Sequence, residues 1–165
     1  MHTLLVLRHA QAGGAPGVHD TARPLTGRGR RDAERAGRWL LARDTAPDWV
    51  VCSPARRARE TWERVNAALG AAAPAAGAVI YEPRVYDAGV QDLLDLVNEQ
   101  PEEARTVLLV GHNPAALHLA AGLTGRPDLA FPAGALAVIG CATTWAAITP
   151  GAGELVARWA PAPGP

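Results

Sequence analysis

The 165-residue sequence predicts an α/β protein, with a central, mostly parallel sheet and helices on both of its faces in a three-layer sandwich. Short, continuous apolar runs, which are typical of strands buried on both faces, alternate along the chain with longer segments of helical periodicity. The composition is that of a folded chain, because 48% of the residues are hydrophobic and 19% are charged. The length fits one ordinary domain. We therefore expect a single domain over residues 1–160 and a flexible tail over residues 161–165.

The first half of the chain contains two apolar runs, and a helical segment follows each of them. A loop rich in Gly, Ala and Pro separates the first run from its helix, for which Thr26 is the expected N-cap. Ser53 and Pro54 have the residue types of an N-cap and a first helical residue, so they predict the start of the second helix. The expected elements are a strand at 3–7, a loop at 10–24, a helix at 27–43, a strand at 49–52 and a helix at 54–69.

The second half continues this alternation and then changes to apolar stretches alone. Pro101 ends the third helix, because proline is excluded from helix interiors. After the fourth strand, Asn113 and Pro114 are expected to be the N-cap and the first residue of the fourth helix. The last three apolar stretches predict two or three strands joined by turns. The expected elements are a strand at 78–81, a helix at 90–99, a strand at 106–110, a helix at 114–123, and apolar stretches at 135–141, 145–148 and 155–159.

Charge and hydropathy argue against several classes of protein. The net charge is zero, with 16 basic and 16 acidic residues, whereas proteins that bind nucleic acid or membrane surfaces through charge are usually basic. No apolar run has the length of a transmembrane helix or of a signal peptide's apolar region. Cys52 and Cys141 lie far apart in apolar stretches, which indicates buried free thiols. We expect a cytoplasmic protein that binds neither nucleic acid nor membranes, and the oligomeric state stays open.

Every fixed cation in the chain is an arginine, because the sequence contains no lysine. The first 64 residues hold 12 arginines against 7 acidic residues. Any anion-binding site must therefore be built from arginine and histidine.

Polar residues with this chemistry follow the predicted strands. Ligands of parallel sheets bind at the carboxyl ends of the strands, where helices begin. Arg8 and His9 follow the first strand, Arg57 lies near the start of the second helix, and His112 follows the fourth strand. Two imidazoles and two guanidinium groups beside helix N-termini have the make-up of a phosphate site.

Arg57 and its neighbour Arg56 lie on different faces of the second predicted helix. Arg56 shares the charged face with Glu60, four residues further on, and we expect these two side chains to pair. Arg57 lies at the edge of the apolar stripe in the first turn, so we assign Arg57 to the site. The other histidines are expected to be structural: His2, His19 and His118.

Four segments on the predicted turns carry a family resemblance. They are Leu7-Arg8-His9, Pro24-Leu25-Thr26-x-x-Gly29, Ser53-Pro54-Ala55-Arg56-Arg57-Ala58-Arg59-Glu60-Thr61 and Gly111-His112-Asn113-Pro114. In this order they resemble the R-H-G, P-L-T-x-x-G and S-x-x-x-R-A-x-x-T segments and the second histidine motif of the histidine phosphatase superfamily. The resemblance spans about residues 3–148 and is most similar to SixA-type phosphohistidine phosphatases. It implies a phosphoglycerate mutase-like sandwich.

The same resemblance implies roles for four residues of a phosphatase. His9 is the nucleophile and forms a phosphohistidine intermediate, while Arg8, Arg57 and His112 bind the phosphoryl group. Attack requires a neutral imidazole, and the nearby arginine charges are expected to lower the pKa of His9. Phosphoryl transfer depends mostly on positioning and charge stabilisation. We expect neither a metal nor another cofactor, because acidic clusters of the kind that bind Mg²⁺ are missing from these turns.

The sequence also departs from the superfamily pattern. Ala10 replaces the glycine of the first motif, and its methyl group is expected to be tolerated while narrowing the site. The glutamate motif of the mutase branch is absent, and Asn113 stands where the acid phosphatase branch has Asp. Glu82 and Asp87, in the loop after the third strand, are the possible general acids. Without a clear general acid, a phosphoramidate substrate is favoured over an alkyl ester, because the imidazole nitrogen of the phosphoramidate can be protonated near neutral pH. The preferred substrate is a histidine-phosphorylated protein.

Four other functions stay open at this point. A small-molecule phosphomonoesterase would act on a small phosphate ester with Asp87 or Glu82 as its acid. A non-catalytic module would bind phosphate without turnover. A metal site on His9 and His112 would need third and fourth ligands that the sequence does not supply. A phosphoglycerate mutase is the weakest alternative, because its acid motif is missing.

Overall fold

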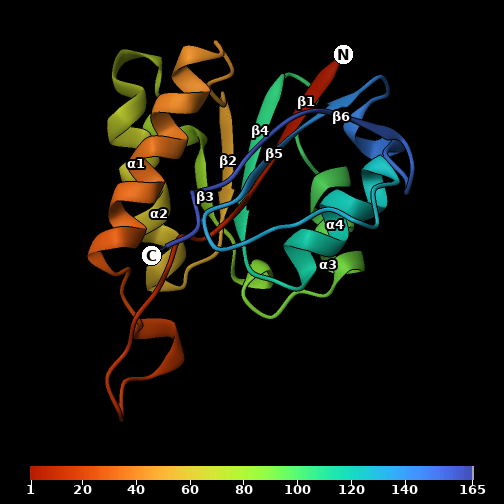
Figure 1. The fold of residues 1–165 in the computed structure, drawn as a ribbon. Helices are drawn as coiled ribbons and strands as arrows, with labels where there is room; N and C mark the ends of the chain where they lie inside the picture. Colours follow the sequence, from red (N-terminus) through yellow and green to blue (C-terminus); the bar gives the residue numbers. More distant parts are fainter. Residues whose placement is uncertain (165) are drawn as a thin grey trace.

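A computed structural model describes residues 1–164 and has the expected three layers (Figure 1). The strands are β1 (His2–Arg8), β2 (Trp49–Cys52), β3 (Val79–Tyr81), β4 (Thr106–Gly111), β5 (Leu136–Cys141) and β6 (Gly153–Trp159). The α-helices are α1 (Gly27–Ala42), α2 (Arg56–Leu69), α3 (Val90–Asn98) and α4 (Ala115–Thr124). None of the helices among residues 1–164 is long and apolar enough to cross a membrane.

One six-stranded sheet in the order β3-β2-β4-β1-β5-β6 forms the middle layer. β4 lies between β1 and β2 and is parallel to both, and β2 is also parallel to β3. β5 runs antiparallel to both β1 and β6. The carboxyl ends of β1, β2 and β4 therefore meet at one edge of the sheet, which is where the sequence predicts the polar cluster.

The apolar run of β1 is continuous because the strand is covered on both faces. Leu4 and Val6 belong to the cluster that the sheet forms with α3 and α4, whereas Leu5 and Leu7 belong to the cluster with α1 and α2. All four side chains are fully buried. Figure 1 shows the two helix pairs on opposite sides of the sheet. The prediction of a three-layer sandwich is thus confirmed.

The predicted starts of the second and fourth helices are wrong by one or two residues. α2 begins at Arg56, and Ser53 stays outside it with Oγ accepting a hydrogen bond from the Ala55 amide at 3.2 Å. α4 begins at Ala115, with Pro114 as its N-cap residue. The side chain of Asn113 still contacts the first turn, since its Oδ1 accepts from the Leu117 amide at 3.3 Å while its Nδ2 donates to the Phe131 carbonyl at 2.9 Å.

The apolar stretch at 145–148 is not a strand. It forms a 3-10 turn, η5 (Trp145–Ala147), so β5 and β6 are the two strands of the C-terminal part. The side-chain amide of Asn98 explains this difference, since it donates to the carbonyls of Trp145 at 2.7 Å and Ile148 at 3.0 Å. Those carbonyls are then occupied by a side chain of α3 rather than by a neighbouring strand.

The start of α1 closes the long loop that follows β1. Thr26 caps the helix as predicted, with Oγ1 accepting from the Gly29 amide at 3.0 Å. The Gln11 carbonyl packs so closely on Gly29 that a Cβ there would lie 2.1 Å from its oxygen. Glycine at this position therefore lets the segment just after β1 dock on α1. This close approach gives the glycine of the P-L-T-x-x-G segment a physical reason.

Two further expectations concern the thiols and the C-terminal tail. Cys52 and Cys141 are buried and unpaired, as predicted. In the tail, the carbonyl of Ala162 accepts a hydrogen bond from Nη2 of Arg28 at 2.6 Å. The expected tail ends at Pro165, which lies outside the described residues.

Candidate active site

The backbone of His9 is anchored on both sides where β1 ends. Its amide donates to the Gly111 carbonyl at the end of β4, and its carbonyl accepts from the Gly134 amide just before β5, both at 3.0 Å. His9 is therefore fixed at the edge of the sheet, between the strands that flank β1.

A second anchor comes from the buried hydroxyl of Thr61 on α2. It accepts the Ala10 amide at 3.0 Å and donates to the Arg57 carbonyl at 2.7 Å. The methyl group of Ala10 packs with Leu25 and Ala33 in a small buried cluster. The expected tolerance of alanine here thus has a structural basis, because its methyl group belongs to an apolar cluster.

Among the described residues, only one nitrogen of the His9 imidazole has a hydrogen-bond partner. Its Nδ1 lies 2.8 Å from the Ala10 carbonyl oxygen, which can only accept, so Nδ1 carries the proton. The lone pair is then on Nε2. Burial is the main cause that lowers the pKa of His9 to about 3, and the charges of Arg57 and Arg8 add to it. The expected direction is confirmed, but burial outweighs the arginine charges.

The two predicted arginines, whose charges act on this imidazole, come from different elements. Arg8, at the end of β1, donates from Nη1 to the Phe131 carbonyl at 3.1 Å. Arg57, in the first turn of α2, is only 8% exposed although it is an arginine. Arg56 is exposed and pairs with Glu60 at 2.5 Å, as predicted from the helix faces.

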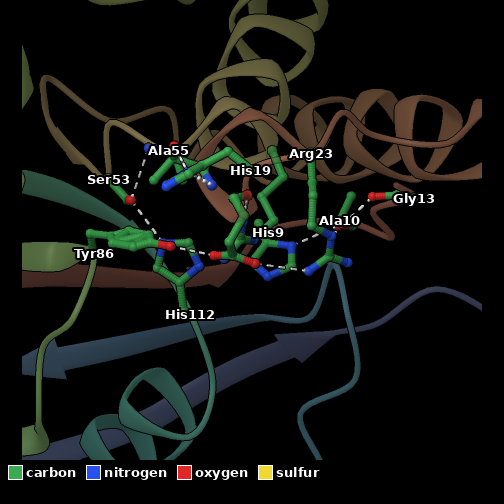
Figure 2. A network of polar contacts seen from close by, with 12 residues as sticks. His9, Ala10, Gly13, His19, Arg23, Ser53, Ala55, Tyr86 and His112 are labelled. Carbon is green, nitrogen blue, oxygen red and sulfur yellow. Dashed lines mark hydrogen bonds and ion pairs between the residues drawn. The ribbon is translucent and has the colours of Figure 1, made fainter. Parts of the chain in front are cut away.

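His112 follows β4 and stands beside His9, with the two ring centroids 5.2 Å apart. Its Nε2 is hydrogen bonded to Oγ of Ser53 at 2.7 Å. The ring of Tyr86 packs edge-on against the His112 ring, with the two ring centroids 5.7 Å apart (Figure 2). Burial, followed by the charge of Arg57, lowers the pKa of His112 to about 4. Both imidazoles are therefore neutral around pH 7.

A carboxylate that the sequence analysis missed reaches the same place. Asp20 lies in a 3-10 turn, η1 (Asp20–Ala22), within the loop between β1 and α1. Its carboxylate accepts from the Tyr86 hydroxyl, from Nη1 of Arg23 at 3.3 Å and from Nη2 of Arg57 at 3.2 Å. These bonds, that of Tyr86 first, lower the pKa of Asp20 to about 2. Nothing in the sequence distinguishes Asp20 from an ordinary loop acid.

The two carboxylates proposed as acids lie in the segment after β3. Glu82 caps a 3-10 turn and accepts from Nε of Arg84 at 3.2 Å, and these bonds lower the pKa of its carboxyl. Asp87 is exposed next to Tyr86. Among residues 1–164, no group of three or more His, Cys, Asp and Glu side chains is arranged to hold a metal ion.

Of the other histidines, His2 is structural. It is buried and bonds the carbonyls of Thr143 and Glu102. His118 is exposed on α4. His19 precedes η1, where Nδ1 bonds the hydroxyl of Thr21 at 2.8 Å, and it borders the site in Figure 2.

Two buried side-chain nitrogens of the described chain lack a hydrogen-bond partner, and both belong to this site. They are Nε of Arg8 and Nδ1 of His112. Buried polar atoms are nearly always paired, so such exceptions call for a ligand or an ion. The nitrogen of Arg8 is always a donor. The arrangement can thus bind an anion next to the free lone pair of His9.

Comparisons with known proteins identify related chains. A model of the histidine phosphatase superfamily (branch 1) matches residues 4–77. An uncharacterised protein of Mycobacterium tuberculosis is 36% identical over 160 residues, which are 91% of this chain and 96% of that protein. The structure of a provisionally named phosphohistidine phosphatase SixA from Nakamurella multipartitia is 36% identical with a TM-score of 0.82, over 97% of this chain and 96% of that one. Its counterpart from Agrobacterium tumefaciens is 27% identical with a TM-score of 0.81, over 98% and 99%.

Proposed function

Because this chain belongs to the histidine phosphatase superfamily and is therefore a phosphatase, we propose that it removes the phosphoryl group from phosphohistidine in a protein by way of a phosphorylated His9. The observation that carries this proposal is the free Nε2 lone pair of His9 beside the donors of Arg8, Arg57 and His112. The name of the Nakamurella relative, a phosphohistidine phosphatase, supports the substrate class.

Transfer to the enzyme takes place in one displacement. Nε2 of His9 forms a bond to phosphorus while the bond from phosphorus to the substrate imidazole breaks. When the other ring nitrogen of the substrate carries a proton, its imidazole leaves as a neutral molecule. Arg8 and Arg57 balance the charge of the phosphoryl oxygens, and Arg57 can bind two of them when its terminal nitrogens release Asp20. The Ala10 carbonyl holds the proton on Nδ1 of His9, which carries positive charge in the intermediate.

Hydrolysis then restores the enzyme. Water attacks phosphorus, the bond to Nε2 of His9 breaks, and dihydrogen phosphate leaves with both protons of the water. His9 returns to its neutral form with the proton still on Nδ1. The low pKa of His9 favours this return, because the folded protein disfavours a charged imidazole.

The state of two carboxyl groups supports a phosphoramidate substrate. The carboxyls of Asp20 and Glu82 both have lowered pKa values, since arginines bond them and a tyrosine bonds Asp20. An ionised carboxylate cannot protonate an alkoxide leaving group. A protonated imidazole needs no such donor, so the site suits phosphohistidine better than an alkyl phosphate.

Trapping the intermediate tests the proposed nucleophile. The enzyme is mixed with a ³²P-labelled phosphohistidine protein and quenched in alkali, where phosphohistidine is stable. We expect label on a peptide containing His9, which acid removes, and no label on a folded His9→Gln variant. Turnover without labelled enzyme, or label on another residue, would overturn the assignment.

A further inference from the structure

We propose that Ser53 is a positioning residue that fixes the tautomer of His112, so that Nδ1 of His112 carries the proton and donates it in a hydrogen bond to the phosphoryl group. This inference rests on the proposed function and assigns a role within it. Ser53 is fully buried at the end of β2. Its amide donates to the Val110 carbonyl at 3.0 Å, which ties it to the end of β4, two residues before His112.

The hydrogen bonds around the Ser53 hydroxyl determine where its proton points. Oγ accepts the Ala55 amide at 3.2 Å, and its other contact is Nε2 of His112 at 2.7 Å. A hydroxyl has one proton to donate. Among the described residues, Nε2 of His112 is its acceptor. The hydroxyl therefore donates to Nε2, and the imidazole proton is on Nδ1.

The opposite tautomer would place an unfavourable contact at each ring nitrogen of His112. If Nε2 of His112 carried the proton, the Ser53 hydroxyl would be a buried donor without an acceptor, which costs about 1–3 kcal/mol. The lone pair on Nδ1, which has no partner, would then face the anion site. It would repel phosphoryl oxygens, whereas an N–H group at the same place binds them.

This tautomer also suits a site that must keep His9 uncharged. A neutral N–H donor stabilises a phosphoryl oxygen without adding another cation 5.2 Å from the His9 ring. The low pKa of His112 keeps the ring neutral, so the tautomer is the property that remains to be set.

Three residues at four-residue spacing then support the same site, each in its own way. Ser53 orients His112, Arg57 supplies the guanidinium that we propose binds the phosphoryl group, and Thr61 holds the Ala10 amide. All three are buried polar or charged side chains. This explains why serine, arginine and threonine recur in the S-x-x-x-R-A-x-x-T segment.

The direct test is the tautomer of His112 in the wild-type protein without substrate. Two-dimensional ¹H–¹⁵N NMR of the imidazole nitrogens distinguishes protonated from unprotonated positions, and a His112→Gln variant assigns the signals. We expect a protonated Nδ1 and an unprotonated Nε2. The reverse pattern would overturn the inference. Because no substrate is present, this result stands apart from the test of the proposed function.

Variants at position 53 link the tautomer to catalysis. In Ser53→Ala we expect a mixture of tautomers and a fall in kcat of about 10²-fold, the size seen when one donor to a transition state is lost. Ser53→Thr keeps the hydroxyl, so its His112 tautomer and its kcat should match those of the wild type. If Ser53→Ala leaves the tautomer or kcat unchanged, or if kcat falls while Nδ1 stays fully protonated, Ser53 does not act through His112.

Discussion

Arg57 donates to Asp20 through both terminal nitrogens, to its carbonyl at 2.8 Å and to its carboxylate at 3.2 Å. Asp20 is exposed on the loop between β1 and α1, whereas Arg57 is buried in the site. The guanidinium thus meets a carboxylate in the place where we propose that it binds a phosphoryl group. An anionic substrate must compete with Asp20 for these donors, with its carbonyl for Nη1 and with its carboxylate for Nη2.

The Asp20→Asn substitution should therefore strengthen anion binding. It removes the competing charge but keeps the shape of the side chain. We expect the inhibition constant of inorganic phosphate to fall roughly two- to fivefold, the range expected for an exposed ion pair. Asp128→Asn, which removes an exposed carboxylate paired with Arg126, is the matched control. Weaker phosphate binding in Asp20→Asn would mean that Asp20 instead holds Arg57 ready for the substrate.

Neighbouring arginines on α2 provide a second test. Arg57→Ala removes a guanidinium that we propose binds the phosphoryl group, so kcat/KM should fall about 10²–10³-fold. Arg56→Ala removes an exposed side chain paired with Glu60, and we expect kcat/KM to stay within about threefold of the wild type. Steady-state kinetics with an aryl phosphate measures both. Equal losses would show that the two helix faces do not differ in function.

The low pKa of His9 predicts how stability depends on pH. An unfolded histidine binds a proton near pH 6.5, whereas His9 in the folded protein does so only near pH 3. Between these values the unfolded state binds more protons, so the free energy of unfolding falls as the pH is lowered. Urea unfolding measures how much the free energy of unfolding falls between about pH 7 and about pH 5. We expect this fall to be roughly 1–2 kcal/mol smaller in His9→Gln than in the wild type. An identical fall in both proteins would contradict a neutral, buried His9.

The contact between Gly29 and the Gln11 carbonyl predicts an effect on stability. A Cβ at position 29 would lie 2.1 Å from a backbone oxygen that cannot move aside without shifting the segment after His9. Gly29→Ala should lower the free energy of unfolding by about 1–3 kcal/mol. Gly27→Ala, at the first position of the same helix, meets only the ends of two arginine side chains, at 3.4 and 3.9 Å, and should be neutral or stabilising. Chemical denaturation compares them, and a neutral Gly29→Ala would refute the steric argument.

The sheet and its helices follow from periodicity, because the local pattern and the tertiary burial agree. Leu4 to Leu7 form a continuous apolar run, and the folded strand is covered on both faces. Predictions fail where a side chain that is distant in the sequence determines the backbone conformation. The side chain of Asn98 engages the carbonyls of residues 145 and 148, and no local pattern contains that contact.

In the site, too, some residues could be predicted from the sequence, whereas others depend on contacts between distant segments. His9, Arg8, Arg57 and His112 follow strands or begin a helix, so the topology alone brings them to one edge. Asp20 and Tyr86 are loop residues, and they meet only because two loops approach each other in three dimensions. The role that we propose for Ser53 also depends on a tertiary contact, since its partner is 59 residues away.

The central claim concerns the substrate, and phosphate release from two substrates measured in parallel tests it most directly. One is a protein carrying ³²P-phosphohistidine, and the other is a simple aryl phosphate ester. We predict a higher kcat/KM for the phosphohistidine protein, because its imidazole leaves without a general acid. Faster hydrolysis of the ester, with little release from the protein, would contradict the account and would indicate that a carboxylate such as Asp87 or Glu82 acts as the acid on small phosphate esters.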